Sequence, residues 1–215
     1  MKMKLYDYWR SPAAYRVRIA LALKGLDVER VPISIFPGED EQFGATYKAK
    51  NPQMRVPTLE VDGKVSGQSM AIIEWLEEIH PAPALLPSDP WKRLQARAFA
   101  DVIACDVHPL NNLAVLKKLR DEFSADEEEI ADWYRDWIIR GFTALETTAQ
   151  SLEPAQYLFG DQPGIAEICL VPQVANAHRY KTDLSPFPRL MEVEARCRAL
   201  PAFIKAAPDS VKPAA

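Results

Sequence analysis

The chain has 215 residues, of which 48% are hydrophobic and 26% are charged, proportions typical of a soluble globular protein. The net charge of −4 gives no indication of binding to nucleic acid or to an anionic membrane. No apolar run approaches the roughly 20 residues of a membrane-spanning helix, and the N-terminus lacks the apolar region of a signal peptide. We therefore expect one or two domains with a buried core and no membrane or nucleic-acid partner.

Cysteine usage argues against cross-linking and against metal. The three cysteines, Cys105, Cys169 and Cys197, are widely spaced, and the sequence contains no Cys-x-x-Cys pair and no Cys/His ligand cluster. This pattern excludes a disulfide scaffold and a structural zinc site, so no metal is expected. It fits a reducing compartment, and we expect a cytoplasmic protein.

The first 80 residues alternate between strand and helix patterns. In chain order we predict a strand at residues 4–8, a helix at 15–24, a strand at 28–35, a short helix at 42–50, a hairpin with strands at 58–61 and 64–65, and a helix at 70–79. Asp62-Gly63 is a typical two-residue hairpin turn, Gly25 ends the first helix, and Ser69 is the expected cap of the last one. The order β-α-β-α-β-β-α is that of a thioredoxin-like domain.

Beyond this region the pattern becomes helical. Prolines at residues 81, 83 and 87 interrupt any helix and form a connection. Helical patterns follow at residues 91–120, 126–152 and 167–180, with shorter ones at 190–198 and 202–207. The fold class predicted is an α/β thioredoxin-like N-terminal domain plus an all-α C-terminal domain. The predicted boundaries are 1–82 for the first domain, 83–89 for a linker and 90–215 for the helical domain.

Three segments of the first domain are expected to converge on one site. Ser11 precedes a helix N-terminus, where unpaired N–H groups and partial positive charge favour an anion. Val56-Pro57 precedes a strand and is a candidate cis peptide, whose backbone would pair with an extended peptide. Gln68-Ser69 opens the next helix. Each segment alone also fits a structural role as a cap or a turn. Together they indicate a site for a short anionic thiol peptide.

Several longer motifs resemble one family. The chain is similar to the zeta class of glutathione transferases, the group that includes maleylacetoacetate isomerase and maleylpyruvate isomerase, and the resemblance covers nearly its whole length. The matching segments are residues 15–25, 51–52, 56–59, 68–74, 108–113 and 169–177. The resemblance implies the glutathione transferase fold, glutathione as cofactor and a homodimer.

The resemblance also implies roles for single residues. Ser11 would be catalytic, because its hydroxyl would hydrogen-bond the glutathione sulfur and favour the thiolate. Arg179 would bind a carboxylate of the substrate, and Arg10 would meet a second carboxylate or lie on the surface. Tyr8 and Trp9 fit either an apolar wall of the site or the core. The glutathione-binding residues implied are Gln42, Val56, Gln68, Ser69, His108 and Asn112.

The reaction implied is the cis–trans isomerisation of a maleyl diacid. The thiolate of glutathione adds to the cis double bond, the bond rotates, and elimination releases the fumaryl product. The substrate would be a small dicarboxylate, either maleylacetoacetate from tyrosine breakdown or maleylpyruvate from aromatic degradation. Two alternatives stay open. The first is a transferase that conjugates or dehalogenates small electrophiles such as α-halo acids, and the second is a glutathione-binding module without catalysis.

The chain departs from the zeta pattern at two places. Where the family usually has Ser-Ser-Cys, this chain has Ser11-Pro12-Ala13. A reductive dehalogenase needs that cysteine to resolve a mixed disulfide, so Ala13 counts against this activity. The second departure is Gly164, which replaces a capping hydroxyl, while Glu167 replaces the Asp of the cap. Glu167 is expected to reach back to the Gly164 N–H and preserve half of the capping box.

Overall fold

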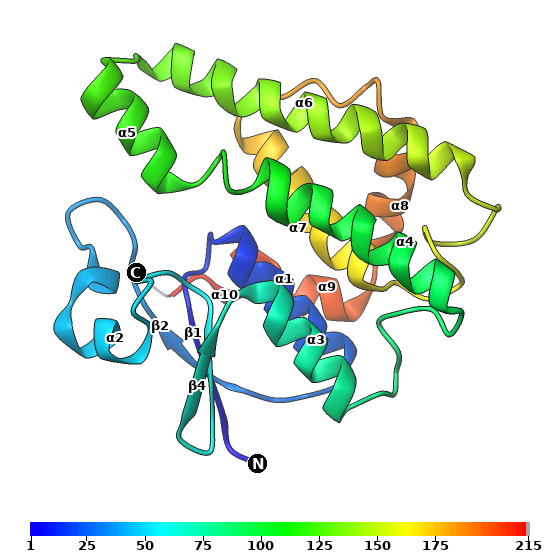
Figure 1. Cartoon of the computed structure of the whole chain (residues 1–215), viewed down its shortest axis with the longest axis horizontal. Helices are drawn as coiled ribbons and strands as arrows, with labels where there is room; N and C mark the ends of the chain where they lie inside the picture. The colour runs from blue at the N-terminus through cyan, green and yellow to red at the C-terminus, as the bar shows by residue number, and fades with distance from the viewer. Residues whose placement is uncertain (214–215) are drawn as a thin grey trace. The chain divides into compact units, whose positions relative to one another are not determined.

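The computed structural model describes residues 1–213 and divides the chain into two compact units (Figure 1). Unit 1 contains residues 1–85 together with the C-terminal residues from Ala199, and unit 2 is Leu86–Arg198. The predicted boundaries place residues 199–215 in the helical domain, whereas the structure groups the described ones among them with unit 1. The reason is that helix α9 (Pro201–Ala206) packs against helix α1 (Pro12–Leu23), burying Phe203 and Ala206.

Unit 1 is built on a four-stranded mixed sheet with the strand order β2-β1-β3-β4. The central strand β1 (Met3–Asp7) pairs in parallel with β2 (Glu29–Pro32) and antiparallel with β3 (Thr58–Val61). Strand β4 (Lys64–Gly67) completes the edge. Leu5 and Asp7 of β1 have no exposed surface, so this strand passes through the middle of the unit. The sheet confirms the predicted α/β thioredoxin-like fold.

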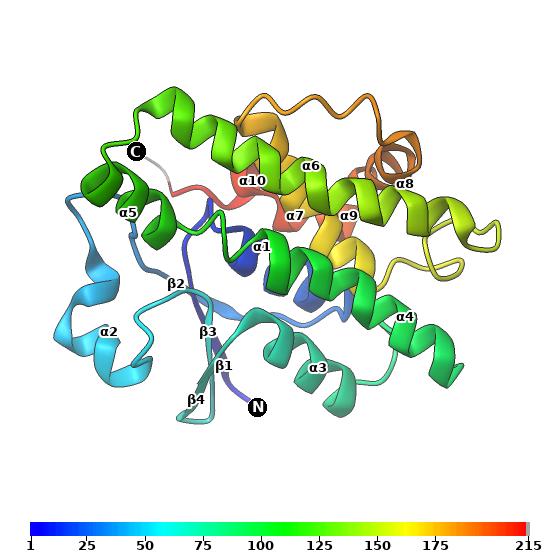
Figure 2. The same ribbon diagram turned by 45° about the horizontal axis from the view of Figure 1, so that its top comes forward.

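Helices cover both faces of this sheet. Helices α1 and α3 (Ser69–Ile79) pack together on one face, and α2 (Ala45–Lys50) lies on the other (Figures 1 and 2). The predicted helix at 42–50 is two elements, the short 3₁₀ helix η1 (Glu41–Phe43) and α2. Gly44, with extended backbone angles, separates them.

The hairpin between β3 and β4 confirms its predicted turn. Asp62 and Gly63 have φ values of +47° and +83°, the left-handed pair that a two-residue type I′ turn requires. Val61 pairs with Lys64 across the turn. The Asp-Gly dipeptide therefore sets the register of the whole sheet edge.

The predicted cap of α3 is wrong by one residue. Gln68 is the N-cap, and Ser69 is the first residue of the helix. Gln68 has φ +66° and ψ 110°, a backbone conformation that costs of order 1–3 kcal/mol in a residue with a side chain. The Ser69 hydroxyl is instead within 3.5 Å of Arg16 Nη1, which donates to it from α1.

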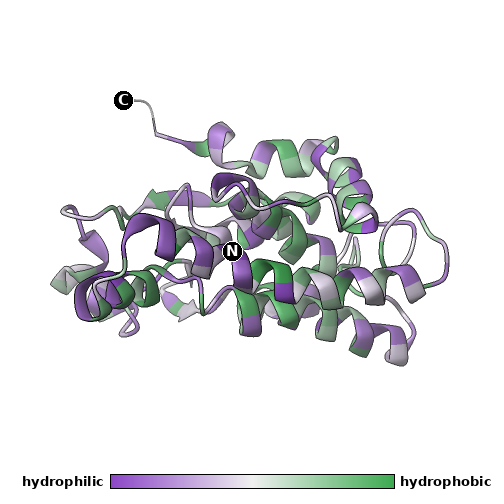
Figure 3. Ribbon diagram, turned by 90° about the horizontal axis from the view of Figure 1, so that it is seen from above, coloured by the Kyte–Doolittle hydropathy of each residue, from purple (hydrophilic) through white to green (hydrophobic). Residues whose placement is uncertain are grey.

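The regular elements of unit 2 are all helices, joined by loops. Its elements are α4 (Pro90–Asp101), the π-helix η2 (Val102–Val107), α5 (Leu113–Phe123), α6 (Glu127–Ser151), α7 (Ile165–Arg179) and α8 (Pro188–Arg198). Hydrophobic and hydrophilic residues alternate along the helices (Figure 3). The most buried helix is α7, and its neighbours α4 and α8 pack against it. No helix among residues 1–213 is long and apolar enough to cross a membrane.

The single helix predicted at residues 91–120 is wrong. The chain leaves α4 through η2, turns at residues 108–112 and begins again at α5. Pro109 has no N–H and disfavours helical geometry before it, which explains the break. The side chain of Asn112 caps the new helix by accepting a hydrogen bond from the Ala114 N–H at 2.9 Å.

Two side chains fix helix starts in unit 2, and the second of them confirms the predicted contact of Glu167. Asp126 caps α6, with its carboxylate accepting from the backbone of Glu128 and Glu129. Glu167 accepts a hydrogen bond from the Gly164 N–H at 2.7 Å. A second oxygen of Glu167 accepts from the Leu158 N–H at 2.8 Å, so this buried carboxylate also fixes the loop before α7.

Candidate functional site

The site in unit 1 begins at the N-terminus of α1. Ser11 is the N-cap of this helix and is buried, with its Oγ accepting a hydrogen bond from the Ala14 N–H at 3.2 Å. Its own N–H donates to the carbonyl of Tyr8 at 2.9 Å, which closes the loop between β1 and α1. Pro12 occupies the first helical position, where no N–H is needed.

A cavity of about 480 Å³ lies beside this loop, wholly within unit 1. Its wall is formed by residues 7–10, by residues of the segment from Arg30 to Glu41, and by Pro213 near the C-terminus. Arg10 is part of this wall, whereas the other predicted site residues of unit 1 are not among its lining residues: Ser11, Gln42, Val56, Gln68 and Ser69. Tyr8 and Trp9 also line it, which favours the apolar-wall interpretation over the core.

A buried charge cluster holds this loop in place. Asp7 has no exposed surface and accepts hydrogen bonds from Arg18 Nη1 and Arg30 Nη2, both at 3.0 Å. Arg18 also donates from Nη2 to the carbonyl of Trp9 at 3.0 Å. Burial lowers the pKa of Arg18, and the charge of Asp7 offsets part of that effect. The cluster therefore ties the end of β1 to the loop that carries Ser11.

The other predicted site residues of unit 1 lie in three segments of the chain. The Val56–Pro57 peptide bond is cis, as expected from the sequence, and leads into β3. Gln42 is buried, its Nε2 donates to Asp40 at 3.2 Å, and its Oε1 has no hydrogen-bond partner among residues 1–213. Gln68 and Ser69 stand at the start of α3.

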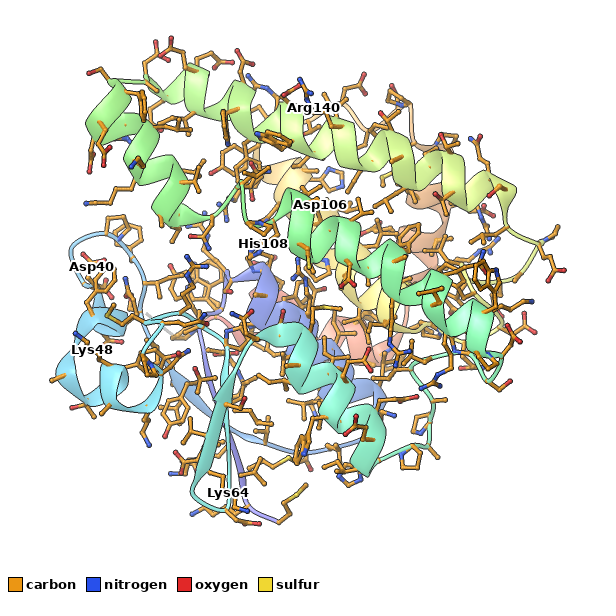
Figure 4. All side chains as sticks on the ribbon, viewed as in Figure 1. Asp40, Lys48, Lys64, Asp106, His108 and Arg140 are labelled. Atoms are coloured by element: carbon orange, nitrogen blue, oxygen red, sulfur yellow. The ribbon has the colours of Figure 1, made fainter. Side chains whose placement is uncertain are left out.

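The predicted residues of unit 2 are His108, Asn112 and Arg179. Asp106 and His108 lie near the end of η2 (Figure 4), and the His108 N–H donates to the Ile103 carbonyl at 2.9 Å. Asn112 uses its side chain as the cap of α5. Arg179 is exposed at the end of α7, with its guanidinium carbon 5.2 Å from the ring centroid of Tyr180.

Nine residues that line the cavity were not singled out by sequence reasoning, among them Arg30, Phe36 and Pro213. Phe36 is 53% exposed, unusual for an aromatic side chain, and follows directly after a predicted strand. An aromatic residue directly after a strand was the sequence feature that could have indicated this part of the cavity wall. Pro213 carried no signal, because its place depends on packing of the chain end. Among the residues described, no group of His, Cys, Asp and Glu is placed to hold a metal ion.

The thioredoxin-like unit 1 and the helical unit 2 are the parts of a glutathione transferase, and comparisons with known proteins show that family. A family profile described as "Glutathione S-transferase, N-terminal domain" matches residues 5–84. The chain is 46% identical to a maleylpyruvate isomerase from Ralstonia sp. over 96% of this chain and 97% of that protein. It is 46% identical to the maleylacetoacetate isomerase of Rattus norvegicus over 94% and 90% of the two chains.

Similarity to solved structures identifies the class of glutathione transferase to which the chain belongs. A holo maleylpyruvate isomerase, described as a bacterial glutathione S-transferase of the zeta class, has a TM-score of 0.95 with 45% identity, covering 99% of this chain and 100% of that one. A maleylacetoacetate isomerase from Anaeromyxobacter dehalogenans, with dicarboxyethyl glutathione and citrate bound in its active site, has a TM-score of 0.87 with 41% identity, covering 100% and 94%. The present chain belongs to the zeta class of the glutathione transferases.

Proposed function

We propose that this protein is a glutathione-dependent cis–trans isomerase of a maleyl diacid, maleylacetoacetate or maleylpyruvate, in the breakdown of tyrosine or related aromatic compounds. One observation carries the proposal: Arg10 lines the cavity directly before the capped Ser11 in the chain. A cation at the cavity wall is thus adjacent in the chain to the serine whose hydroxyl is expected to meet the thiolate. The names of the relatives, maleylpyruvate and maleylacetoacetate isomerase, support the same reaction.

The residues of unit 1 fit glutathione. The cap uses one acceptor position of the Ser11 hydroxyl, so its O–H remains available to donate to the sulfur. The partnerless Oε1 of buried Gln42 is an acceptor for a peptide N–H. We propose that Val56 contributes its backbone to the peptide, and that Gln68 and Ser69 hold a carboxylate at the start of α3.

The protein's own groups bind and orient the reactants. Bound glutathione supplies the nucleophilic thiolate, which adds to the double bond and leaves again after rotation. Ser11 stabilises that thiolate by donating a hydrogen bond, which raises its fraction near neutral pH. Arg10 and Arg179 bind carboxylates and stabilise the negative charge that develops on the substrate.

We also propose roles for two residues of unit 2. His108 is half-buried. The side-chain oxygen of Asn112 caps α5, and its amide N–H groups are available to donate hydrogen bonds to a ligand. Both are proposed to bind glutathione, as the resemblance implies. Replacing each by alanine and measuring the glutathione Kd tests this role. An unchanged Kd in both variants contradicts it.

The reaction is tested by following the isomerisation of maleylacetone or maleylpyruvate spectrophotometrically, with and without glutathione. Turnover only in the presence of glutathione, without net loss of the thiol, supports the isomerase. Consumption of glutathione with an α-halo acid, and no isomerisation, favours the conjugating or dehalogenating alternative. Binding of glutathione without any turnover favours a non-catalytic module.

We propose further that the protein is a cytoplasmic homodimer. Its three cysteines form no disulfide with one another, which suits a reducing compartment. Trp91 and Leu94 of α4 are 65% and 52% exposed, an apolar surface of the kind that subunits cover. Light scattering coupled to size exclusion measures the mass directly, and a mass near 24.2 kDa would exclude the dimer.

A further inference from the structure

Two cations flank the indole ring of Trp9 at the edge of the cavity. The guanidinium carbon of Arg10 is 5.4 Å from the ring centroid, and Nζ of Lys212 is 5.2 Å from it. These distances are within the range of a cation–π contact. Lys212 comes from the far end of the chain, so the tertiary structure has brought together two positive charges that the sequence separates by about 200 positions.

The chain end that carries Lys212 is anchored rather than free. We call residues 201–213 the C-terminal segment; it contains α9 and the short helix α10 (Pro208–Val211). Its carbonyls accept hydrogen bonds from two arginines of the buried cluster. Arg18 Nε donates to Ala206 at 2.9 Å, and Arg30 Nη1 donates to Val211 at 3.2 Å. The second anchor is directly adjacent to Lys212.

The same two arginines are fixed by buried Asp7, and Arg18 also holds the carbonyl of Trp9. The loop bearing Trp9 and Arg10 and the segment bearing Lys212 therefore share one rigid support. Pro213, the next residue, lines the cavity together with Arg10 and Trp9. The C-terminal segment is thus part of the cavity wall.

Neither cation beside Trp9 is neutralised by the described part of the protein. Within residues 1–213, Arg10 and Lys212 form no ion pair with a carboxylate. Of the acidic residues that line the cavity, Asp7 pairs with the buried arginines, Glu41 accepts from the Ser34 N–H at 2.6 Å, and Glu39 forms no ion pair with Arg10 or Lys212 within residues 1–213. Two cations that contact one indole ring without a carboxylate partner favour an anionic ligand beside that ring.

We propose that Lys212 joins Arg10 in binding the carboxylate end of the substrate at the Trp9 wall. The inference rests on the proposed function, which places a substrate carboxylate at Arg10. A carboxylate accepts hydrogen bonds at two oxygens and takes more than one donor. The flexible stem of a lysine lets its ammonium follow that group. The C-terminal segment thereby contributes to recognition of dicarboxylates.

The test compares two glutathione derivatives by calorimetry. Dicarboxyethyl glutathione and S-methyl glutathione share the peptide and differ in the carboxylates attached at sulfur. In the variant Lys212→Ala, we expect the Kd for the dicarboxylate derivative to rise about fivefold, the size of a partly exposed charge pair, with the S-methyl derivative unaffected. Lys212→Arg keeps the charge and restores the affinity. Added salt weakens binding of the dicarboxylate more in the wild type than in Lys212→Ala.

Lys205→Ala is the matched control. Lys205 lies in the same C-terminal segment but pairs with Asp27 at 3.3 Å, and it should leave both affinities unchanged. Equal affinities of Lys212→Ala and wild type for the dicarboxylate derivative would overturn the inference. So would equal losses for both ligands, because these indicate a structural role. A wild type that binds the dicarboxylate derivative through Lys212 but isomerises no maleyl compound would contradict the proposed function alone.

Discussion

The hydroxyl oxygen of Ser11 lies 3.2 Å from the backbone nitrogen of Ala14, which donates a hydrogen bond to it. The cap consumes an acceptor position and leaves the hydroxyl proton free. Capping the helix and donating to a thiolate are therefore compatible roles of one side chain. Pro12 has no N–H to donate, but the cap does not need one, because the hydrogen bond to Ser11 comes from the Ala14 N–H.

Ser11→Ala should lose both roles. We expect kcat/KM to fall about 10- to 100-fold, the effect of one hydrogen bond to a charged group. The lost cap should cost about 1 kcal/mol of unfolding free energy. The control is Asp89→Ala, which removes the cap of α4, a bond of 2.8 Å from Lys92 N–H, far along the chain from Ser11. A similar loss of activity in both variants would mean that helix stability alone is responsible.

Gly141→Ala should destabilise unit 2 although alanine favours helices. A Cβ at Gly141 would overlap Cγ2 of Val107, at the point where η2 crosses α6. We expect a loss of about 1–3 kcal/mol in urea unfolding, the usual effect of overpacking. In the Val107→Ala background the overlap is gone, and the same glycine change should be neutral or stabilising. Strictly additive effects in this double-mutant cycle would contradict the contact.

Asp7→Asn should be among the most destabilising single changes in unit 1. It leaves Arg18 and Arg30 without their buried counter-charge, which typically costs about 3–5 kcal/mol. Because both arginines anchor the C-terminal segment, limited proteolysis should cleave near residues 207–213 sooner than in the wild type. Lys92→Ala breaks the exposed pair with Glu153, which solvent screens, and should destabilise the protein far less than Asp7→Asn.

The three cysteines should differ sharply in reactivity. Cys105 is exposed, whereas Cys169 and Cys197 have no accessible surface. Burial, aided by Glu167 and Glu194, also raises the pKa of the Cys197 thiol, so little reactive thiolate forms. Alkylation of the folded protein followed by mass spectrometry should label one site, and Cys105→Ser should abolish it. Rapid labelling of Cys197 in the folded state would contradict the observed packing.

Glu194 should destabilise the protein when ionised. Burial raises the pKa of its carboxyl above the ordinary value of 4.5, with Arg198 offsetting part of the shift. A raised pKa in the folded state means that the penalty is absent at pH values below 4.5 and complete above the folded pKa. We expect Glu194→Gln to raise Tm at pH 8 and to change it least at pH 4.

Glu153→Gln should change Tm in the direction opposite to that of Glu194→Gln. The pair with Lys92 lowers the pKa of the Glu153 carboxyl, so its contribution is present near neutral pH and lost in acid. This variant should lower Tm slightly at pH 8. If the two variants shifted Tm in the same direction at pH 8, the assigned environments would be wrong.

Much of unit 1 was predictable because its signals are local. The Asp62-Gly63 turn, the end of the first helix at Gly25 and the position of Pro57 before a strand all depend on the backbone preferences of a few adjacent residues. The predictions that failed are also local, and each has a cause. Pro109 interrupts the predicted helix at 91–120, and Gln68 adopts a strained conformation where Ser69 was expected to cap.

Taken alone, the sequence determined the order of the elements, the capped serine at the start of α1 and the family, because these depend on near neighbours and on continuous motifs. Only the tertiary structure decided that Asp7 meets two arginines, that Val107 needs a glycine opposite it, and that Lys212 stands beside Trp9. Those relationships join residues far apart in the chain. Each depends on how whole elements pack, and an amphipathic helix such as α9 carries no local signal for which surface it will cover.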